Sequence, residues 1–359
     1  MTIADARLYR YRLPLTGPLP AGDRTLTERR GLLLCVTGEE GGEGWGEAAP
    51  LPGFSPETLK EATTQARRLR AALPGLDVPG ADLEAALRAV PTGNWFPAVQ
   101  FAAESAVVEG MAAVRGTSVA QLLGKRTGTV PMNALIPSSE TDLDAVADQI
   151  RRAGYRAVKL KVGRADVETD ARRVRQLHAV LGNDIALRLD ANRKWTWGEA
   201  VAFAEALGDV PIEYVEEPLP APTDLPSLID RTGLPVALDE TTRERSPEEV
   251  PADLPVRAVV LKPTLLGGIV TTRRWAKWAR HRNAEPVISA SYESGVGLRM
   301  LVALAASLSE TPAGLSTYGR LAADVLCPRL PLEGANVDVE QVGTSTVDRA
   351  AIEALAPAR

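Results

Sequence analysis

Acidic and basic residues stand at the ends of a series of short apolar runs in the second half of the chain. The residues at these positions are Lys159 and Lys161, Asp190, Glu216 with Glu217, Asp239 with Glu240, and Lys262. Carboxylates that converge from three consecutive strands would repel one another unless a cation lay between them. Oxygen ligands without histidine or cysteine suit a hard divalent ion. These carboxylates therefore predict a site for Mg²⁺, which Mn²⁺ could replace.

The lysines predict the chemistry that such a metal would assist. Strand side chains alternate, so Lys159 and Lys161 share one face, and Lys161 would face Lys262 across the metal. Burial and a nearby dication lower the pKa of a lysine from about 10.4, which produces a usable general base. A lysine base and a carboxylate held by the metal can together remove the proton next to that carboxylate.

The elements that would position these charges form a repeat of apolar run and helix-length segment. The eight runs are residues 130–136, 157–162, 185–190, 212–216, 236–239, 258–262, 286–291 and 314–317. Continuous apolar runs are typical of parallel strands that are buried on both faces. Eight such units predict a (β/α)₈-type barrel, in which the C-terminal strand ends form the active site. A doubly wound open sheet is less favoured, because no G-x-G-x-x-G follows the first strand.

The first third of the chain predicts a separate α+β capping domain. Residues 6–13 and 31–37 are typical of strands, and a Gly-rich turn leads from the second into 45–47 as in a hairpin. Helical periodicity follows over residues 56–73 and 98–114. We predict a capping domain at 1–125, a catalytic barrel at 126–325, and a C-terminal segment at 326–359 that packs back on the capping domain.

Composition restricts the partners. The 359 residues carry 41 basic and 46 acidic side chains, a net charge of −5, which gives no electrostatic footprint for nucleic acid. Apolar stretches such as 300–308 are too short to span a bilayer. Cys35 and Cys327 form no disulfide framework or zinc-ligand spacing, which favours a reducing cytoplasm. We therefore expect a small-molecule carboxylate as the partner, with neither nucleic acid nor membrane.

Seven motifs occur in order at the spacing of barrel strands. They are residues 44–55, 158–163, 187–195, 215–218, 238–240, 260–264 and 288–294. This ordered set resembles the o-succinylbenzoate synthase family of the enolase superfamily, in the subgroup similar to muconate-lactonizing enzyme. The resemblance implies a (β/α)₇β barrel, selects Asp190, Glu216 and Asp239 as the metal ligands, and assigns Glu240 to a supporting position behind them. It makes Lys161 the base and Lys262 the residue that stabilises the intermediate, with Lys159 supporting the base electrostatically.

The activity that the resemblance implies is a Mg²⁺-dependent syn-dehydration. It converts 2-succinyl-6-hydroxy-2,4-cyclohexadiene-1-carboxylate to o-succinylbenzoate in menaquinone or phylloquinone biosynthesis. Lys161 would take the proton next to the ring carboxylate and return it to the leaving hydroxyl. Lys262 would lie over the other ring face as a cation–π partner.

Further residues are expected around the substrate and behind the ligands. Ser289 and Ser291 match positions that contact the succinyl group, and Phe54 and Ser55 lie in a loop that is expected to cap the pocket. Arg188 and Asn192 are expected to support the ligands, and the unused carboxylates Glu217 and Glu240 to point out of the barrel. The chain departs from the family pattern at Ala290 and Tyr292, next to the predicted succinyl contacts.

Three other functions are alternatives for a barrel with these residues. N-acylamino acid racemisation or dipeptide epimerisation would use the two facing lysines to remove and return a proton on opposite faces. A metal-free aldolase would use one strand-end lysine as a Schiff-base nucleophile, but it leaves the carboxylates unexplained. A non-catalytic barrel that acts as a scaffold would leave both sets unexplained.

Overall fold

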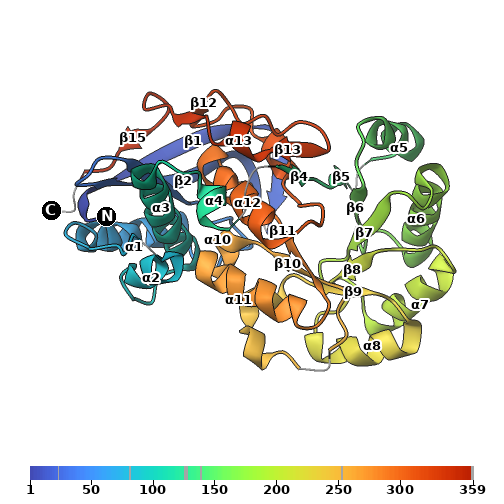
Figure 1. Cartoon of the computed structure of the whole chain (residues 1–359). Helices are drawn as coiled ribbons and strands as arrows, with labels where there is room; N and C mark the ends of the chain where they lie inside the picture. The colour runs from blue at the N-terminus through green and yellow to red at the C-terminus, as the bar shows by residue number, and fades with distance from the viewer. Residues whose placement is uncertain (23, 81, 125–127, 138–139, 252–253, 357–359) are drawn as a thin grey trace.

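The computed structural model describes residues 1–22, 24–80, 82–124, 128–137, 140–251 and 254–356. An antiparallel sheet with covering helices lies beside a curled parallel sheet that has its own helices (Figure 1). The predicted fold class, a barrel of TIM type with an N-terminal α+β cap, is confirmed.

The cap sheet has the strand order β15-β1-β2-β3. Its elements in the first third are β1 (Ile3–Ala21), β2 (Arg24–Gly38), β3 (Glu43–Ala48), α1 (Leu59–Ala72), α2 (Leu83–Ala89), α3 (Pro97–Arg115) and α4 (Val119–Leu122). Helix α3 packs so closely on β3 that a Cβ on Gly46 would lie 1.8 Å from the carbonyl oxygen of Ala102. The glycines of the Gly-Trp-Gly motif therefore permit the contact between helix and sheet that builds the cap.

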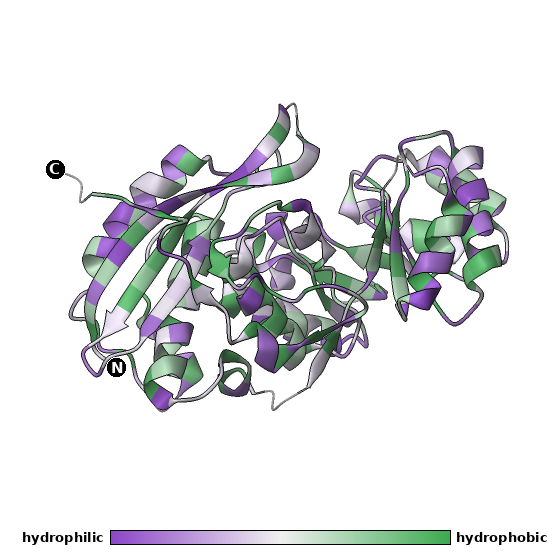
Figure 2. Cartoon of the chain, turned by 90° about the horizontal axis from the view of Figure 1, so that it is seen from above, coloured by the Kyte–Doolittle hydropathy of each residue, from purple (hydrophilic) through white to green (hydrophobic). Residues whose placement is uncertain are grey.

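The barrel sheet consists of seven parallel strands in the order β11-β10-β9-β8-β7-β6-β5. The strands are β5 (Ala134–Ile136), β6 (Ala157–Lys161), β7 (Ala186–Asp190), β8 (Tyr214–Glu216), β9 (Val236–Leu238), β10 (Ala258–Leu261) and β11 (Glu285–Ile288). The helices are α5 (Leu143–Arg152), α6 (Val167–Leu181), α7 (Trp197–Leu207), α8 (Leu225–Thr232), α9 (Thr241–Glu244), α10 (Pro263–Leu266), α11 (Ile269–Arg280) and α12 (Gly295–Leu308). Apolar residues run along the strands, whereas the covering helices carry both apolar and polar residues (Figure 2). This pattern is that of parallel strands buried on both faces.

Two of the eight predicted runs differ from the structure. Residues 314–317 do not form a strand: Ala313 bridges Met132 and Gly314 bridges Ser289, and the chain then turns into a 3₁₀ helix, η3 (Ser316–Arg320). These two bridges join the first and last strands, so the barrel has seven full strands and a minimal eighth. The first run is split, because β4 (Thr129–Pro131) pairs with a C-terminal strand and only β5 joins the barrel.

The C-terminal segment crosses both parts of the molecule (Figure 1). Its elements are β12 (Leu326–Cys327), β13 (Asn336–Asp338), α13 (Val339–Val342), β14 (Thr346–Val347) and β15 (Glu353–Ala354). Strand β13 pairs with β4, whereas β15 pairs with β1 of the cap. The predicted boundary at 125–126 lies outside the described residues, and the division into three segments stays a prediction. Among the described residues, no helix has the length and apolar character to cross a membrane.

Candidate active site

The strand register brings the predicted residues to one end of the barrel. Lys161 on β6 is the Cα partner of Asp190 on β7, and Asp190 is the partner of Glu216 on β8. Asp239 and Lys262 directly follow β9 and β10. Because parallel strands in register end at the same level, these five side chains lie together at the C-terminal mouth of the barrel.

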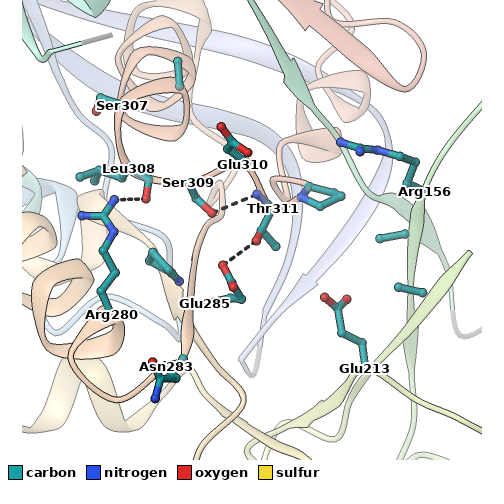
Figure 3. A pocket seen from close by; sticks show the side chains of 16 residues that line it. Arg156, Glu213, Arg280, Asn283, Glu285, Ser307, Leu308, Ser309, Glu310 and Thr311 are labelled. Atoms are coloured by element: carbon teal, nitrogen blue, oxygen red, sulfur yellow. Dashed lines mark hydrogen bonds between the residues drawn. The ribbon is translucent and has the colours of Figure 1, made fainter.

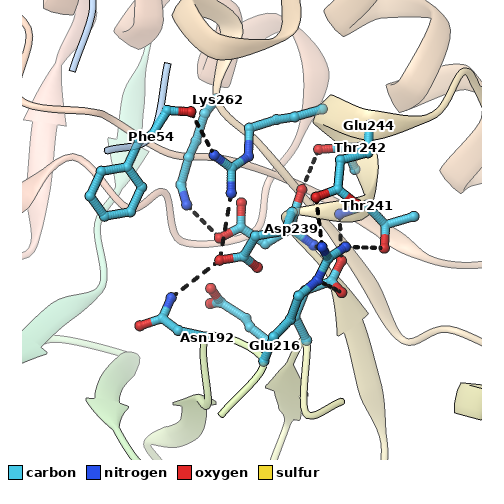
Figure 4. A network of polar contacts seen from close by, with 12 residues as sticks. Phe54, Asn192, Glu216, Asp239, Thr241, Thr242, Glu244 and Lys262 are labelled. Atoms are coloured by element: carbon cyan, nitrogen blue, oxygen red, sulfur yellow. Dashed lines mark hydrogen bonds and ion pairs between the residues drawn. The ribbon is translucent and has the colours of Figure 1, made fainter. Parts of the chain in front are cut away.

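Ion pairs connect the lysines and carboxylates across the barrel interior. The Lys159 Nζ lies 2.9 Å from Glu216 Oε2 and 3.2 Å from Asp190 Oδ2. The Lys161 Nζ lies 3.6 Å from Asp190 Oδ2. Lys262 pairs with Asp239 Oδ2 at 2.5 Å (Figure 4). Every carboxylate of the set is at least 97% buried, whereas Lys161 keeps 30% of its side chain exposed. Lys161 is therefore the most accessible amine of the three to a molecule in the mouth.

Burial and charge act in opposite directions on these groups. Burial alone would lower the pKa of Lys159, but Asp190, Glu216 and Asp239 raise it well above its ordinary value. Burial would raise the pKa of Asp190, but the three lysines hold it well below its usual range. Burial raises the pKa of Glu216 to about 7, because Asp190 and Asp239 add to the effect and Lys159 offsets it only in part. Burial thus opposes the charged form of each of these groups, and at Glu216 the neighbouring lysine offsets that effect only in part.

The donor set suits a hard divalent cation. Asp190, Glu216 and Asp239 offer only carboxylate oxygens, and Asp239 Oδ1 is buried without a hydrogen-bond partner. As the side chains stand, no group of three or more His, Cys, Asp or Glu residues in the described part of the chain is gathered tightly enough to hold a metal. Lys159 pairs with both Asp190 and Glu216, and Lys262 pairs with Asp239. The residues fit Mg²⁺ in chemical type and burial.

Two of the expected supporting residues lie beside the site, and one lies below it. Asn192 accepts a 2.8 Å hydrogen bond from Lys161 Nζ and donates at 3.4 Å to Glu240 Oε1. Burial and Asp239 raise the pKa of Glu240 to about 7. Arg188 is fully buried one layer deeper, where it donates to Glu213 at 2.6 Å. Arg188 therefore lies inside the barrel at the level of Lys159, its Cα partner on β6.

The prediction that Glu240 points out of the barrel is wrong, and Glu217 departs from the strand alternation on which its predicted direction depended. Glu240 faces Asn192, and Glu217 is fully buried with a φ of 38°, which breaks the alternation of side chains along a strand. The Oε1 of Glu217 accepts from the backbone N–H groups of Asp239, at 3.0 Å, and Thr241, at 2.8 Å. Arg193 pairs with the other Glu217 oxygen at 3.1 Å. Glu217 and Arg193 thus fix the turn that carries Asp239.

The predicted substrate contacts lie on the cap loop and on the segment after β11. Phe54 is 36% exposed, and Ser55 uses its hydroxyl oxygen to accept from Leu51 N–H within its own loop. Ser289 donates to the carbonyl of Gly314 at 3.3 Å, whereas the buried Ser291 hydroxyl has no partner. Ser291 is the serine of this pair whose hydroxyl is left for a ligand. All four assignments stay predictions.

Sequence reasoning missed two residues at the mouth. Arg243 on α9 donates to the Phe54 carbonyl at 3.1 Å and lies 3.6 Å from Glu240, so it joins the cap loop to the barrel (Figure 4). Tyr292 is near enough to the cluster that Lys159 and Lys262 partly offset the rise that burial causes in its pKa. Tyr292 carried a signal, as a departure from the family pattern. Arg243 carried none, because its contact joins residues 189 positions apart.

A cavity of about 880 Å³ lies at the opposite end of the barrel, where the strands begin (Figure 3). Some of its side chains are paired: Thr311 donates to Glu285 at 2.9 Å, and Arg280 donates to the carbonyl of Leu308. None of the strand-end lysines or of the proposed metal ligands lines it. The charged cluster lies instead at the C-terminal mouth, the end at which barrels of this type carry their active sites.

Two family models and several known proteins match this chain. Residues 142–344 match the family model described as enolase C-terminal domain-like, and residues 3–110 match the MenC N-terminal domain. The chain is 35% identical over 330 residues to an o-succinylbenzoate synthase from Edwardsiella ictaluri, covering 90% of this chain and 93% of that protein. An o-succinylbenzoate synthase from Pasteurella multocida is 32% identical, covering 91% and 93%. An N-succinyl Arg/Lys racemase structure from Bacillus cereus superposes with a TM-score of 0.83 at 22% identity, covering 98% and 97%, which shows the shared fold.

Proposed function

The chain belongs to the o-succinylbenzoate synthase family of the enolase superfamily, and we propose that it catalyses the dehydration of 2-succinyl-6-hydroxy-2,4-cyclohexadiene-1-carboxylate to o-succinylbenzoate. The observation that carries the proposal is the register of Lys161, Asp190 and Glu216 at adjacent strand ends. It sets an accessible amine beside buried carboxylates that suit a divalent cation. The substrate has a carboxylate, which the cation could bind, and an acidic proton next to it, which the amine could remove.

We assign the metal site to Asp190, Glu216 and Asp239, with Mg²⁺ as the cofactor. When bound there, Mg²⁺ supplies positive charge that stabilises the extra negative charge on the carboxylate oxygens after proton loss. Lys159 pairs with Asp190 and Glu216 and keeps these two side chains oriented.

Lys161 acts as both base and acid in the proposal. Asn192 and Asp190 hold its Nζ at 2.8 and 3.6 Å, and its partly exposed side chain reaches the mouth. Lys161 removes the proton next to the ring carboxylate and returns it to the hydroxyl on the same face. The C–H and C–O bonds break, water leaves, and the ring becomes aromatic. Lys262, anchored by Asp239, supplies a cation to the other ring face.

The racemase alternative uses the same lysines, one on each face of the substrate. Structural likeness to the Bacillus cereus racemase fits it as well as it fits dehydration, because only the fold is shared at 22% identity. The relatives at 32 to 35% identity over most of the chain favour dehydration. We also propose a place in menaquinone or phylloquinone biosynthesis in a reducing cytoplasm, in keeping with the unpaired Cys35 and Cys327.

One experiment separates the two activities. Purified protein with Mg²⁺ is given the cyclohexadiene substrate, and o-succinylbenzoate is followed by its ultraviolet absorbance. The same preparation is given an N-succinyl amino acid, and racemisation is followed by polarimetry. Rapid product formation in the first assay supports the proposal, whereas racemisation without o-succinylbenzoate formation would replace it with the alternative.

A further inference from the structure

Two charged side chains of the cap domain are buried where the cap meets the barrel. Glu47 on β3 is fully buried, and Arg29 on β2 is 2% exposed. Both bind the segment between β11 and α12, which contains the predicted substrate contacts Ser289 and Ser291. We call residues 291–294 the β11 loop.

The Glu47 carboxylate accepts hydrogen bonds at the start of α12. Its oxygens accept from the Ser294 N–H at 2.9 Å, the Ser294 hydroxyl at 2.8 Å and the Gly297 N–H at 2.7 Å, and Tyr11 donates a further short bond. These N–H groups lie where a helix has no internal acceptors, and the helix dipole favours a negative charge there. A Cβ at Gly297 would lie 2.5 Å from Glu47 Oε2, so this position requires glycine. The cap domain thus completes the N-terminus of a barrel helix.

Arg29 binds the same loop from a second direction. Its guanidinium donates to the carbonyls of Tyr292 at 3.0 Å, Pro50 at 3.1 Å and Ala49 at 2.9 Å. Tyr292 has a φ of 64°, a left-handed conformation that is strained for a residue with a side chain. A residue in this conformation persists only where its surroundings hold it. Arg29 holds Tyr292 in place, and it also binds the chain that leads to Phe54.

Glu293 connects the β11 loop to α10, the short helix that follows β10. This buried carboxylate accepts from the Thr264 hydroxyl at 2.6 Å and from the Ser291 N–H at 2.5 Å. Thr264 follows Lys262 by two residues. The loop is therefore fixed on one side by the cap and on the other by the turn that carries a catalytic lysine.

We propose that Glu47 and Arg29 are positioning residues that act through the β11 loop to hold the Ser291 hydroxyl toward the substrate; this inference rests on the proposed function. The loop serves the end of the substrate that is remote from the reacting atoms. Loss of these contacts therefore weakens binding of substrate and transition state alike. Such a loss raises KM more than it lowers kcat.

The test compares two substitutions on the same strand. Glu47→Gln keeps the size of the side chain but replaces one acceptor oxygen with a donor. Glu43→Gln is the matched control, because Glu43 is exposed and pairs with Arg349 at the outer surface. Since hydrogen bonds to a charged group contribute about tenfold or more each, we expect Glu47→Gln to raise KM about tenfold with kcat changed less than about threefold. Glu43→Gln should match the wild type.

Hydrogen exchange gives a readout that does not depend on activity. Peptides covering residues 291–298 should exchange at least about tenfold faster in Glu47→Gln, while those of α6, far from the cap, stay unchanged. Arg29→Met should show the same pattern, with partial recovery in Arg29→Lys. If Glu47→Gln does not fold, Ser294→Ala replaces it, because it removes one Glu47 contact and no charge.

The outcomes separate the two proposals. A KM and a local exchange rate in Glu47→Gln equal to those of Glu43→Gln would overturn the positioning role. Faster exchange throughout both domains would also overturn it, since that result indicates general destabilisation. A wild type that forms no o-succinylbenzoate would overturn the proposed function, and the exchange comparison would still decide whether Glu47 holds the loop.

Discussion

Lys159 gives a direct test of how the barrel balances its buried charge. Lys159→Met keeps the volume of the side chain but removes the ammonium that lies 2.9 Å from Glu216 and 3.2 Å from Asp190. The three side chains are at most 14% exposed. Removing one partner of a buried ion pair costs about 3–5 kcal/mol, so in EDTA we expect the free energy of unfolding to fall by that amount.

Mg²⁺ should reverse part of this loss. If Asp190, Glu216 and Asp239 bind the ion, Lys159 competes with it, and the variant binds Mg²⁺ more tightly than the wild type does. Each tenfold gain in affinity returns about 1.4 kcal/mol at saturating metal. The destabilisation measured in Mg²⁺ should therefore be at least about 1.4 kcal/mol smaller than in EDTA.

The assay is urea unfolding followed by tryptophan fluorescence, with and without Mg²⁺. Lys194→Met is the matched control, because Lys194 lies on the solvent-exposed turn beyond Asn192 and should show no change in either buffer. Equal destabilisation of the Lys159 variant in EDTA and in Mg²⁺ would show that the carboxylates do not bind the ion, and it would refute the reasoning.

Three further predictions concern the cap, the fold and the substrate. Burial raises the pKa of Glu104 to about 6 from the ordinary 4.5, so the folded chain binds the proton more tightly. This stabilisation is complete below pH 4.5 and falls by about 2 kcal/mol as pH rises through 6. Glu104→Gln should remove this pH dependence of the free energy of unfolding, measured by urea unfolding across the same range. The same pH dependence in wild type and variant would contradict the prediction. Gly46→Ala places a Cβ 1.8 Å from a carbonyl oxygen of α3 and should cost more than about 4 kcal/mol by thermal unfolding, whereas Gly198→Ala, with open space, should not destabilise. Ser291→Ala should raise KM about two- to tenfold in steady-state kinetics with kcat kept, while Ser289→Ala, whose hydroxyl already bonds to a carbonyl, should change KM less.

Local patterns in the chain were enough to predict most of the barrel. Residues 258–261 are apolar without interruption, a pattern that indicates a strand buried on both faces. The strand-end charges were then located by register, since Lys161, Asp190 and Glu216 are neighbours as soon as the strands are parallel. The prediction of a strand at 314–317 was wrong because two isolated bridges suffice to join the edges of the sheet. A sequence does not reveal so short a pairing.

The connections between cap and barrel could not be predicted in the same way. Glu47 meets Ser294 across 247 positions, and Arg29 meets Tyr292 across 263. Nothing in the periodicity of β3 distinguishes a carboxylate that faces solvent from one that ends a helix in another domain. The direction of Glu217 could not be predicted for a related reason, because its positive φ departs from the alternation on which the prediction depended.

The most direct test of the account is o-succinylbenzoate formation by the wild type and by Lys161→Ala, each with Mg²⁺ and with EDTA. We expect rapid product formation only from the wild type in Mg²⁺. In the variant, kcat should fall by about 10²–10⁴-fold because the general base is gone. Circular dichroism should show the variant folded. Product formation by folded Lys161→Ala at the wild-type rate, or by the wild type in EDTA, would contradict the central claim that this lysine and a divalent ion perform the reaction.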